Sequence, residues 1–191
     1  MSYDFLTESF PETVIVDGKE VRVRTSYRCI LEILSFFKDE LFTEVEKLSI
    51  SLVIFYIDLP ENKEMAMKEM MRFIRCYADE KQNNEESRED PFDFEIDSSS
   101  IYSAFFQIYG IDLSEIDLHW FQFLSMFENL NDGTPNLVNI MNIRQMKIDA
   151  SLPNDKKAEL RRLKRKYSLS AEKDTFYKSN ELAGLLSSGL K

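Results

Sequence analysis

The sequence is poor in residues that interrupt or cross-link a chain. Only five glycines and five prolines occur among 191 residues, which leaves room for long regular elements. The two cysteines, Cys29 and Cys76, stand far apart, each within an apolar helical pattern, so we expect buried free thiols in preference to a disulfide or a zinc site. The sequence therefore predicts a mostly helical protein.

The sequence also lacks the marks of a membrane or secreted protein. Its longest apolar run, residues 50–57 with one serine inside, falls short of the about 20 apolar residues that cross a bilayer. The first ten residues hold two acidic side chains and no basic one, unlike a secretory signal. Lys and Arg number 24 against 34 Asp and Glu, and this net charge of −10 disfavours nucleic-acid binding and suits a cytoplasmic protein.

Motifs of catalysis are absent as well. The only histidine, His119, is too few for a metal cluster, and no nucleophile elbow or glycine-rich turn accompanies it. No phosphate-binding loop of the GxxxxGK[ST] or GxGxxG type occurs. We therefore expect no enzyme activity and no cofactor. His119 is interpreted as a structural residue, packed or facing a partner, in preference to a general base.

The first positive signal is a β-hairpin. Residues 13–24 contain two runs rich in β-branched side chains around Asp17-Gly18, a pair that readily adopts the positive φ angles of a tight turn. An isolated two-stranded hairpin is marginal in water. This hairpin is therefore expected to pack on helices or to pair with another edge.

Three amphipathic patterns after the hairpin predict helices. The first follows Ser26 as its N-cap and is expected to lie over the hairpin. The second opens with a capping box, Thr43 with Glu46 three residues later, although 50–57 would also suit a buried strand. The third covers 61–81, where four methionines suit either core packing, which we favour, or an adaptable partner groove.

A change of composition divides the chain. Between residues 82 and 100, seven acidic side chains against one basic predict a solvated linker, placed at 82–98. It separates a hairpin plus three helices at 1–81 from a helical part at 99–167, which is expected to pack on the first. Residues 168–191 are weakly patterned and are predicted to form a frayed, flexible tail. The predicted fold class is thus mainly α (α+β), a multi-helix domain with an N-terminal β-hairpin and a C-terminal basic helix.

Residues 101–131 hold two aromatic-rich helical patterns joined by Gly-Ile-Asp-Leu. The first is expected to end at Gly110, which suits the left-handed conformation after a helix. The second is expected to begin at Ser114, with Asp117 in its first turn against the positive end of the helix dipole. Its apolar residues recur with helical spacing from Trp120 onward, so this stretch is predicted to build a core.

A last helix is predicted from Asn154 or Asp155 to Tyr167. It carries seven basic residues against two acidic ones, a net +5 on an acidic chain. It suits an exposed helix docked through its apolar side, a face for an acidic protein segment such as that of a neighbouring copy, or, last, a nucleic-acid site. The basic residues singled out as partner-binding candidates are Arg161, Arg162, Lys164 and Arg165.

Short motifs along most of residues 1–169 carry a family resemblance. They are Asp4-Phe5-Leu6-Thr7, Tyr102 with Phe105, Tyr109-Gly110-Ile111-Asp112-Leu113, Leu118-His119-Trp120 with Phe123 and Leu130, Ile140 with Ile143-Arg144, and Leu163-Lys164 with Tyr167. With them the sequence resembles the gene-product-fifteen family, encoded in tail-morphogenesis modules of phages and prophages of Gram-positive bacteria. Phe121 departs from the family, which usually has a second Trp there; the replacement is conservative if the position packs.

The resemblance implies a non-enzymatic tail assembly chaperone that binds the tape measure protein. It also implies the major tail (tube) protein as a further partner, a homo-oligomer, and action in the cytoplasm of the bacterial host without retention in the mature virion. His119 and Trp120 join the four basic residues as candidate partner-binding residues. The alternative is a structural minor tail or tail completion protein that stays in the virion, and a nucleic-acid-binding regulator ranks last.

Overall fold

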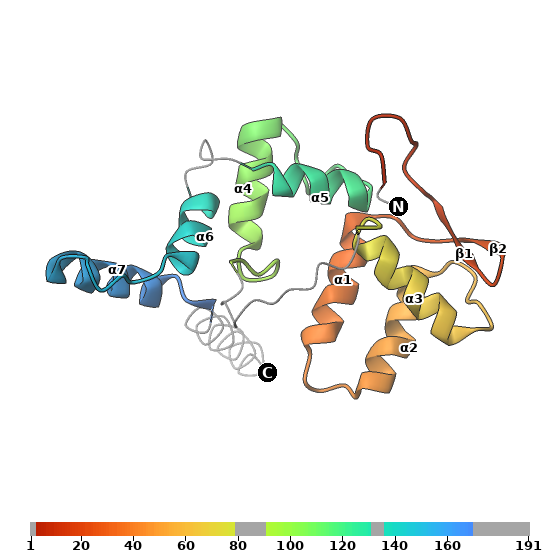
Figure 1. Ribbon diagram of the computed structural model, residues 1–191. Coiled ribbons are helices and arrows are strands. Elements are labelled where there is room, and N and C mark those ends of the chain that lie inside the picture. The colour runs from red at the N-terminus through yellow and green to blue at the C-terminus, as the bar shows by residue number, and fades with distance from the viewer. Residues whose placement is uncertain (1–2, 79–90, 131–135, 170–191) are drawn as a thin grey trace, which may run out of the picture. The chain divides into compact units, whose positions relative to one another are not determined.

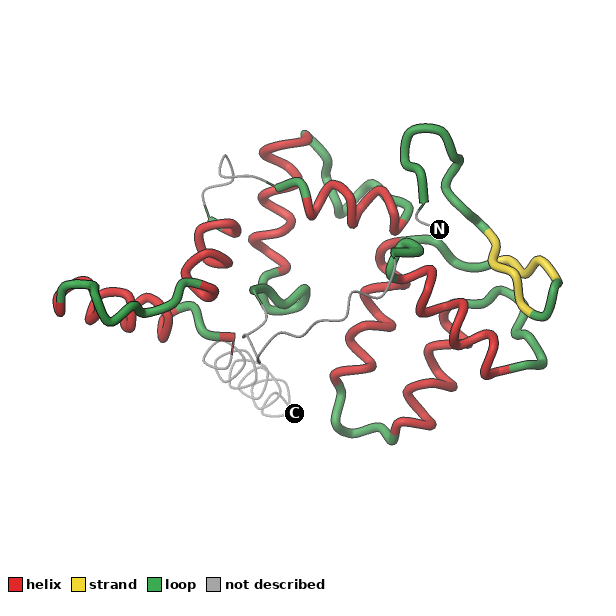
Figure 2. The backbone as a smooth tube through the Cα atoms, in the orientation of Figure 1, coloured by secondary structure: helices red, strands yellow, loops and turns green. Residues whose placement is uncertain are grey.

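The computed structural model describes residues 3–78, 91–130 and 136–169 (Figure 1). In chain order the elements are β1 (Thr13–Val16), β2 (Lys19–Arg22), α1 (Tyr27–Lys38), α2 (Glu44–Phe55), α3 (Lys63–Ile74), α4 (Ser98–Tyr109), α5 (Trp120–Glu128), α6 (Leu137–Gln145) and α7 (Asn154–Lys166). Figure 2 shows that helix predominates and that the two strands form one hairpin. The prediction of a mainly α protein with a small β part is confirmed.

The chain folds into two compact units that alternate along the sequence. Unit 1 comprises Met1–Asn83 and Leu113–Asn129, and unit 2 comprises Asn84–Asp112 and Leu130–Lys191. The sequence placed a boundary at 82–98, of which 82–90 lie outside the described residues. Unit 1 therefore includes α5, a helix that the sequence assigned to the C-terminal part.

The predicted hairpin is confirmed in unit 1. β1 and β2 pair antiparallel, and the turn takes positive φ at both Asp17 (49°) and Gly18 (74°). This geometry matches the right-handed twist of the strands. The prediction that α1 lies over the hairpin is wrong: α3 packs against β1, whereas α1 packs against α2 and α5.

The predicted caps of α1 and α2 are confirmed. The Ser26 hydroxyl accepts a hydrogen bond from the Arg28 amide. Thr43 and Glu46 form the capping box, in which the Thr43 amide donates to the Glu46 carboxylate at 2.9 Å and the Glu46 amide donates to Thr43 Oγ1 at 3.4 Å. Since α2 continues to Phe55, residues 50–57 do not form a strand.

The helix α5 closes the core of unit 1, but it begins at Trp120 and not at Ser114 as predicted. The preceding backbone pairs with a distant segment instead: the Tyr27 amide donates to Leu118 O at 3.0 Å, and the Trp120 amide donates to Thr25 O at 2.7 Å. These long-range bonds replace the local ones that a helix from Ser114 would need. The helix then buries Trp120, Phe121, Phe123 and Phe127.

Unit 2 packs α6 against α4 and α7. As predicted, α4 ends at Gly110 with a left-handed φ of 65°. The prediction of a solvated linker is wrong for Asp93 and Asp97, which are 5% and 4% exposed. Both carboxylates accept backbone amides nearby, and Asp97 also pairs with Arg144. Residues 170–191, the greater part of the predicted tail, lie outside the described residues.

Candidate protein-binding surfaces

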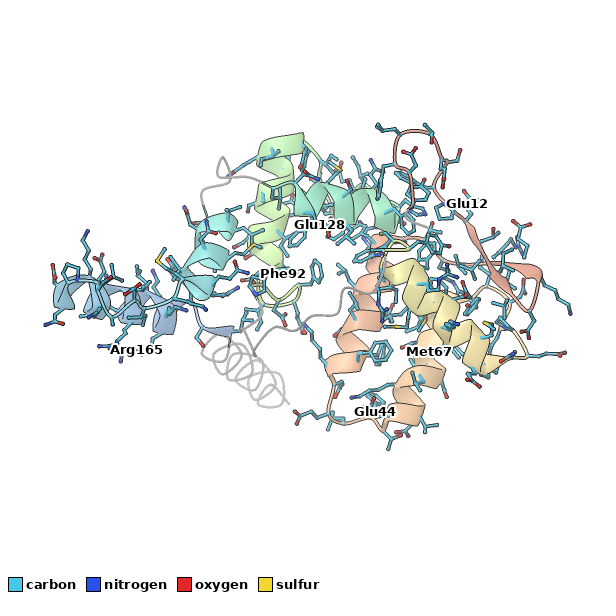
Figure 3. All side chains as sticks on the ribbon, viewed as in Figure 1. Glu12, Glu44, Met67, Phe92, Glu128 and Arg165 are labelled. Atoms are coloured by element: carbon cyan, nitrogen blue, oxygen red, sulfur yellow. The ribbon has the colours of Figure 1, made fainter. Side chains whose placement is uncertain are left out.

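An apolar groove runs between α2 and α3 on unit 1, and we call it the α2–α3 groove. Its volume is about 520 Å³. The lining side chains are Val45, Leu48, Ser49, Leu52, Val53, Leu59, Lys63, Glu64 and Met67. Val45 is 73% exposed and Val53 60% exposed, although both are apolar. Figure 3 labels Met67 on α3, at the opposite wall of the groove.

The groove exists because α2 is apolar on two sides. Leu52 and Phe55 face the core of unit 1 and are buried, and Val45, Ser49 and Val53 recur at i, i+4 and i+8 on the outer side. A surface helix with a single apolar stripe would instead place polar residues on its outer side. Contiguous exposed apolar surface is typical of interaction sites, so the groove is a candidate site. The sequence indicated a partner groove at the methionines of α3, as the less favoured alternative, but not at these α2 residues. Their i, i+4, i+8 spacing could have indicated a second exposed side of the helix.

His119 is an N-cap. Its Nδ1 accepts from the Phe121 amide at 3.1 Å, and its Nε2 lies 3.1 Å from Pro11 O, to which the neutral ring donates. The imidazole also stacks on Phe10, with ring centroids 4.9 Å apart. Burial lowers the pKa of His119 below 6.5, against weaker raising effects of Pro11 and Glu12. Both ring nitrogens thus serve the structure of unit 1.

Trp120 and Phe121 belong to the core. Trp120 is 2% exposed, and its Nε1 donates to Ile74 O at 2.8 Å. Phe121 is fully buried against Phe73, with ring centroids 4.9 Å apart, so Phe121 fills a packing position. The burial of Trp120 leaves little surface for a partner and favours a packing role for this candidate.

The basic helix α7 docks through its apolar side. Leu160 is buried and Leu163 and Tyr167 are half-buried, as one interpretation of the sequence required. Among the four candidate basic residues, Lys164 is half-buried and donates to Arg144 O. The other three, Arg161, Arg162 and Arg165, are exposed and form no ion pair with the residues that the structure describes. Figure 3 labels Arg165 on this helix.

A cavity of about 530 Å³ adjoins α7. Its lining consists of Arg144, Gln145, Met146, Lys147, Ile148, Lys164, Arg165 and Ser168. Four of these eight residues are basic and none is acidic. Because Arg144 pairs with Asp97, the accessible positive charge comes mainly from the exposed side chains of Lys147 and Arg165. The cavity is therefore suited to an anionic group.

The two cysteines, which were predicted to be buried, are only partly buried. Cys29 and Cys76 are free thiols, and burial raises the pKa of Cys76 to about 12, so that thiol stays protonated at neutral pH.

The described residues contain no group of three or more His, Cys, Asp or Glu side chains placed to hold a metal ion. Among the described helices, none has the length and apolar character needed to cross a membrane.

Comparison with known proteins identifies the class of this chain. A protein-family model matches residues 6–169, which is most of the chain, and its members are bacteriophage proteins. The model is described as "Bacteriophage Gp15 protein", and the chain belongs to this family. The resemblance carried by the sequence motifs is thereby confirmed. No curated protein and no solved structure matches the chain.

Proposed function

We propose that this member of the family is a non-enzymatic tail assembly chaperone that binds the tape measure protein during tail morphogenesis. Membership of a phage family supports a role in building the virion. The observation that carries the finer proposal is the α2–α3 groove, where apolar side chains such as Val45 and Val53 face solvent on an otherwise well-packed unit. A chaperone requires such a surface for apolar segments of its client.

The groove suits one face of an amphipathic helix. α2 has 12 residues and is therefore about 18 Å long, which is room for about three turns of a bound helix. Anchors at i, i+3 or i+4, and i+7 of the client would lie along the apolar wall. Each Val or Leu side chain that binding buries contributes about 1.5–3 kcal/mol to the binding free energy. The entropy lost on association offsets part of this gain. The resulting modest affinity would let tube subunits displace the chaperone as the tail grows.

The non-enzymatic part of the proposal is supported by how the reactive side chains are used. His119 commits both ring nitrogens to backbone partners, and Cys76 has a raised pKa. Neither group is available as an activated base or nucleophile. On this proposal the protein acts in the host cytoplasm, binds the tape measure protein first and the tube protein at handover, and is absent from the finished virion.

Co-expression with the tape measure protein of the same tail module tests the proposal. Affinity capture of this chain is expected to bring down the tape measure protein in soluble form. Val53→Lys places a charge in the groove at an exposed helical site, so folding is expected to change by only about 0.5 kcal/mol while affinity falls about tenfold or more. The matched control is Ile116→Lys, because Ile116 is also apolar and exposed but lies outside the groove.

The content of purified particles separates this function from the structural alternative. A chaperone is expected to be missing from particles that contain the tape measure protein. Stoichiometric recovery of this chain from purified virions, together with failure to capture the tape measure protein, would replace the proposal with a minor tail or tail completion role.

A further inference from the structure

We propose that α6 and α7 present a basic docking surface for the acidic unit 1 of a second copy of this chain, so that copies associate head to tail. The basic docking surface consists of the exposed residues Lys147, Lys156, Arg161, Arg162 and Arg165. This interaction differs from tape measure binding in its physical force, since it depends on charge and not on apolar contact.

Charge is distributed unevenly between unit 1 and the part of unit 2 that holds α6 and α7; over all its described residues, unit 2 has nine basic and seven acidic side chains. Residues 136–169 hold nine basic side chains against three acidic ones, a net charge of +6. The described part of unit 1, residues 3–78 and 113–129, holds 17 acidic against ten basic side chains, a net charge of −7. Every copy thus carries one surface of each sign. Complementary charge of this kind accelerates encounter and fixes the register of docking.

Hydrogen bonds within unit 2 fix the position of the basic docking surface. Lys164 donates to Arg144 O, and the Arg144 side chain pairs with Asp97, so the floor of the adjoining cavity is fixed by internal bonds. Arg165 and Lys147 lie at the rim of that floor beside Met146, which is 50% exposed. An arginine beside a methionine suits a carboxylate carried on a partly apolar protein surface.

The acidic counterpart is concentrated at the ends of α2. Residues 39–64 contain seven acidic side chains against two basic ones. Glu40 and Glu61 are exposed there, and the side chain of Glu44 is 79% exposed. Figure 3 labels Glu44 at the start of α2. These carboxylates provide the partner groups that the exposed arginines of another copy require.

A protein partner is favoured over nucleic acid by the lining of the cavity. The cavity lining contains no aromatic side chain on which a base would stack. Because the two docking surfaces differ, the contact is heterologous and extends into a ring or an open row.

The test is the mass of the purified full chain in solution, measured by sedimentation velocity across protein concentration. Self-association is expected to weaken about tenfold or more between about 50 mM and about 500 mM NaCl, because salt screens exposed charges. The double variant Arg161→Glu/Arg165→Glu is expected to be monomeric under low salt. Its control, Lys19→Glu/Lys68→Glu, changes the net charge equally at exposed sites of unit 1 and is expected to associate like the original chain.

A mixing experiment then tests the head-to-tail geometry. The variant Glu40→Lys/Glu61→Lys is also expected to be monomeric, because it lacks the acidic surface. Mixed with Arg161→Glu/Arg165→Glu, it is expected to form a dimer, since one intact surface remains on each chain. Circular dichroism confirms that both variants fold. A monomeric original chain, association indifferent to salt and to both variants, or loss only of co-purified nucleic acid in the arginine variant would overturn the proposal.

Discussion

Arg144 holds Asp97 in a two-point ion pair across 47 residues of sequence. Nη1 donates to Oδ2 at 2.6 Å and Nη2 donates to Oδ1 at 3.0 Å, and the two residues are only 3% and 4% exposed. The same guanidinium donates to Tyr167 O through Nε and to Pro91 O through Nη1. One side chain therefore ties α6 to the start of α4 and to the end of α7.

Removal of the arginine is expected to destabilise unit 2 strongly. Arg144→Met leaves the Asp97 carboxylate buried without its charge partner, a change that costs about 3–5 kcal/mol in free energy of unfolding. Urea denaturation followed by circular dichroism measures the loss. The double variant Asp97→Leu/Arg144→Met is expected to recover much of it, because an apolar pair carries no unpaired charge. A single variant as stable as the original chain would contradict this role.

The pKa of His119 predicts a pH dependence of the stability of unit 1. Burial keeps the folded-state pKa below the 6.5 of a free histidine, so the unfolded chain binds the proton more tightly. The contribution to stability is complete above about pH 6.5 and is lost as the pH falls from there through the folded-state pKa. NMR titration of this single histidine is expected to show a midpoint below 6.5. The variant His119→Asn, which keeps a capping side chain, isolates the effect from that of the carboxylates.

The capping box of α2 is expected to support the groove. Thr43→Ala removes the acceptor of the Glu46 amide, and loss of such a cap costs about 0.5–2 kcal/mol. Thermal unfolding measures the change. Glu40→Ala, at an exposed position before the helix, serves as the control and is expected to unfold like the original chain. Equal melting temperatures of the two variants would show that the cap is dispensable.

The single tryptophan offers a direct measure of its surroundings. Because Trp120 is buried and bonded to Ile74 O, its fluorescence is expected to be blue-shifted in the folded chain and resistant to iodide quenching. Trp120→Phe is expected to lower the free energy of unfolding by about 1–3 kcal/mol, since the Ile74 carbonyl loses its donor. Ready quenching in the native state would instead restore Trp120 as a candidate partner-binding residue.

Local signals in the sequence predicted the local structure well. The Asp17-Gly18 turn, the Ser26 cap, the capping box at Thr43 and the glycine after α4 all depend on a few neighbouring residues, and the structure confirms each. Their physical causes, positive φ and unpaired helix amides, act over one or two turns. The family motifs are also short stretches of neighbouring residues, and for this reason the sequence alone was enough to predict the family.

Long-range pairing explains what the sequence did not predict. The start of α5 moved from Ser114 to Trp120 because residues near Tyr27 compete for the intervening backbone. Asp97 was expected to be solvated because its partner, Arg144, is remote in sequence. The sequence offered a partner groove at the methionines only as the less favoured alternative. The α2 wall of the α2–α3 groove was not predicted, because periodicity shows which residues are apolar but not which apolar face stays uncovered. For the basic helix, pattern alone left three interpretations, and the burial of Leu160 confirms that the helix docks through its apolar side.

The alternation of the two units along the chain also constrains biosynthesis. A ribosome releases the hairpin and the first three helices before it has translated α5, so the nascent unit 1 lacks the aromatic side chains that cover Phe73 and Tyr27. At about 5–20 residues per second, the interval from Asn83 to Asn129 lasts roughly 2 to 9 seconds. The ribosome translates α4 during that interval. Completion of unit 1 is consequently a late event in translation, and a ribosome stalled before Leu113 would display an open core to the cell's own folding machinery.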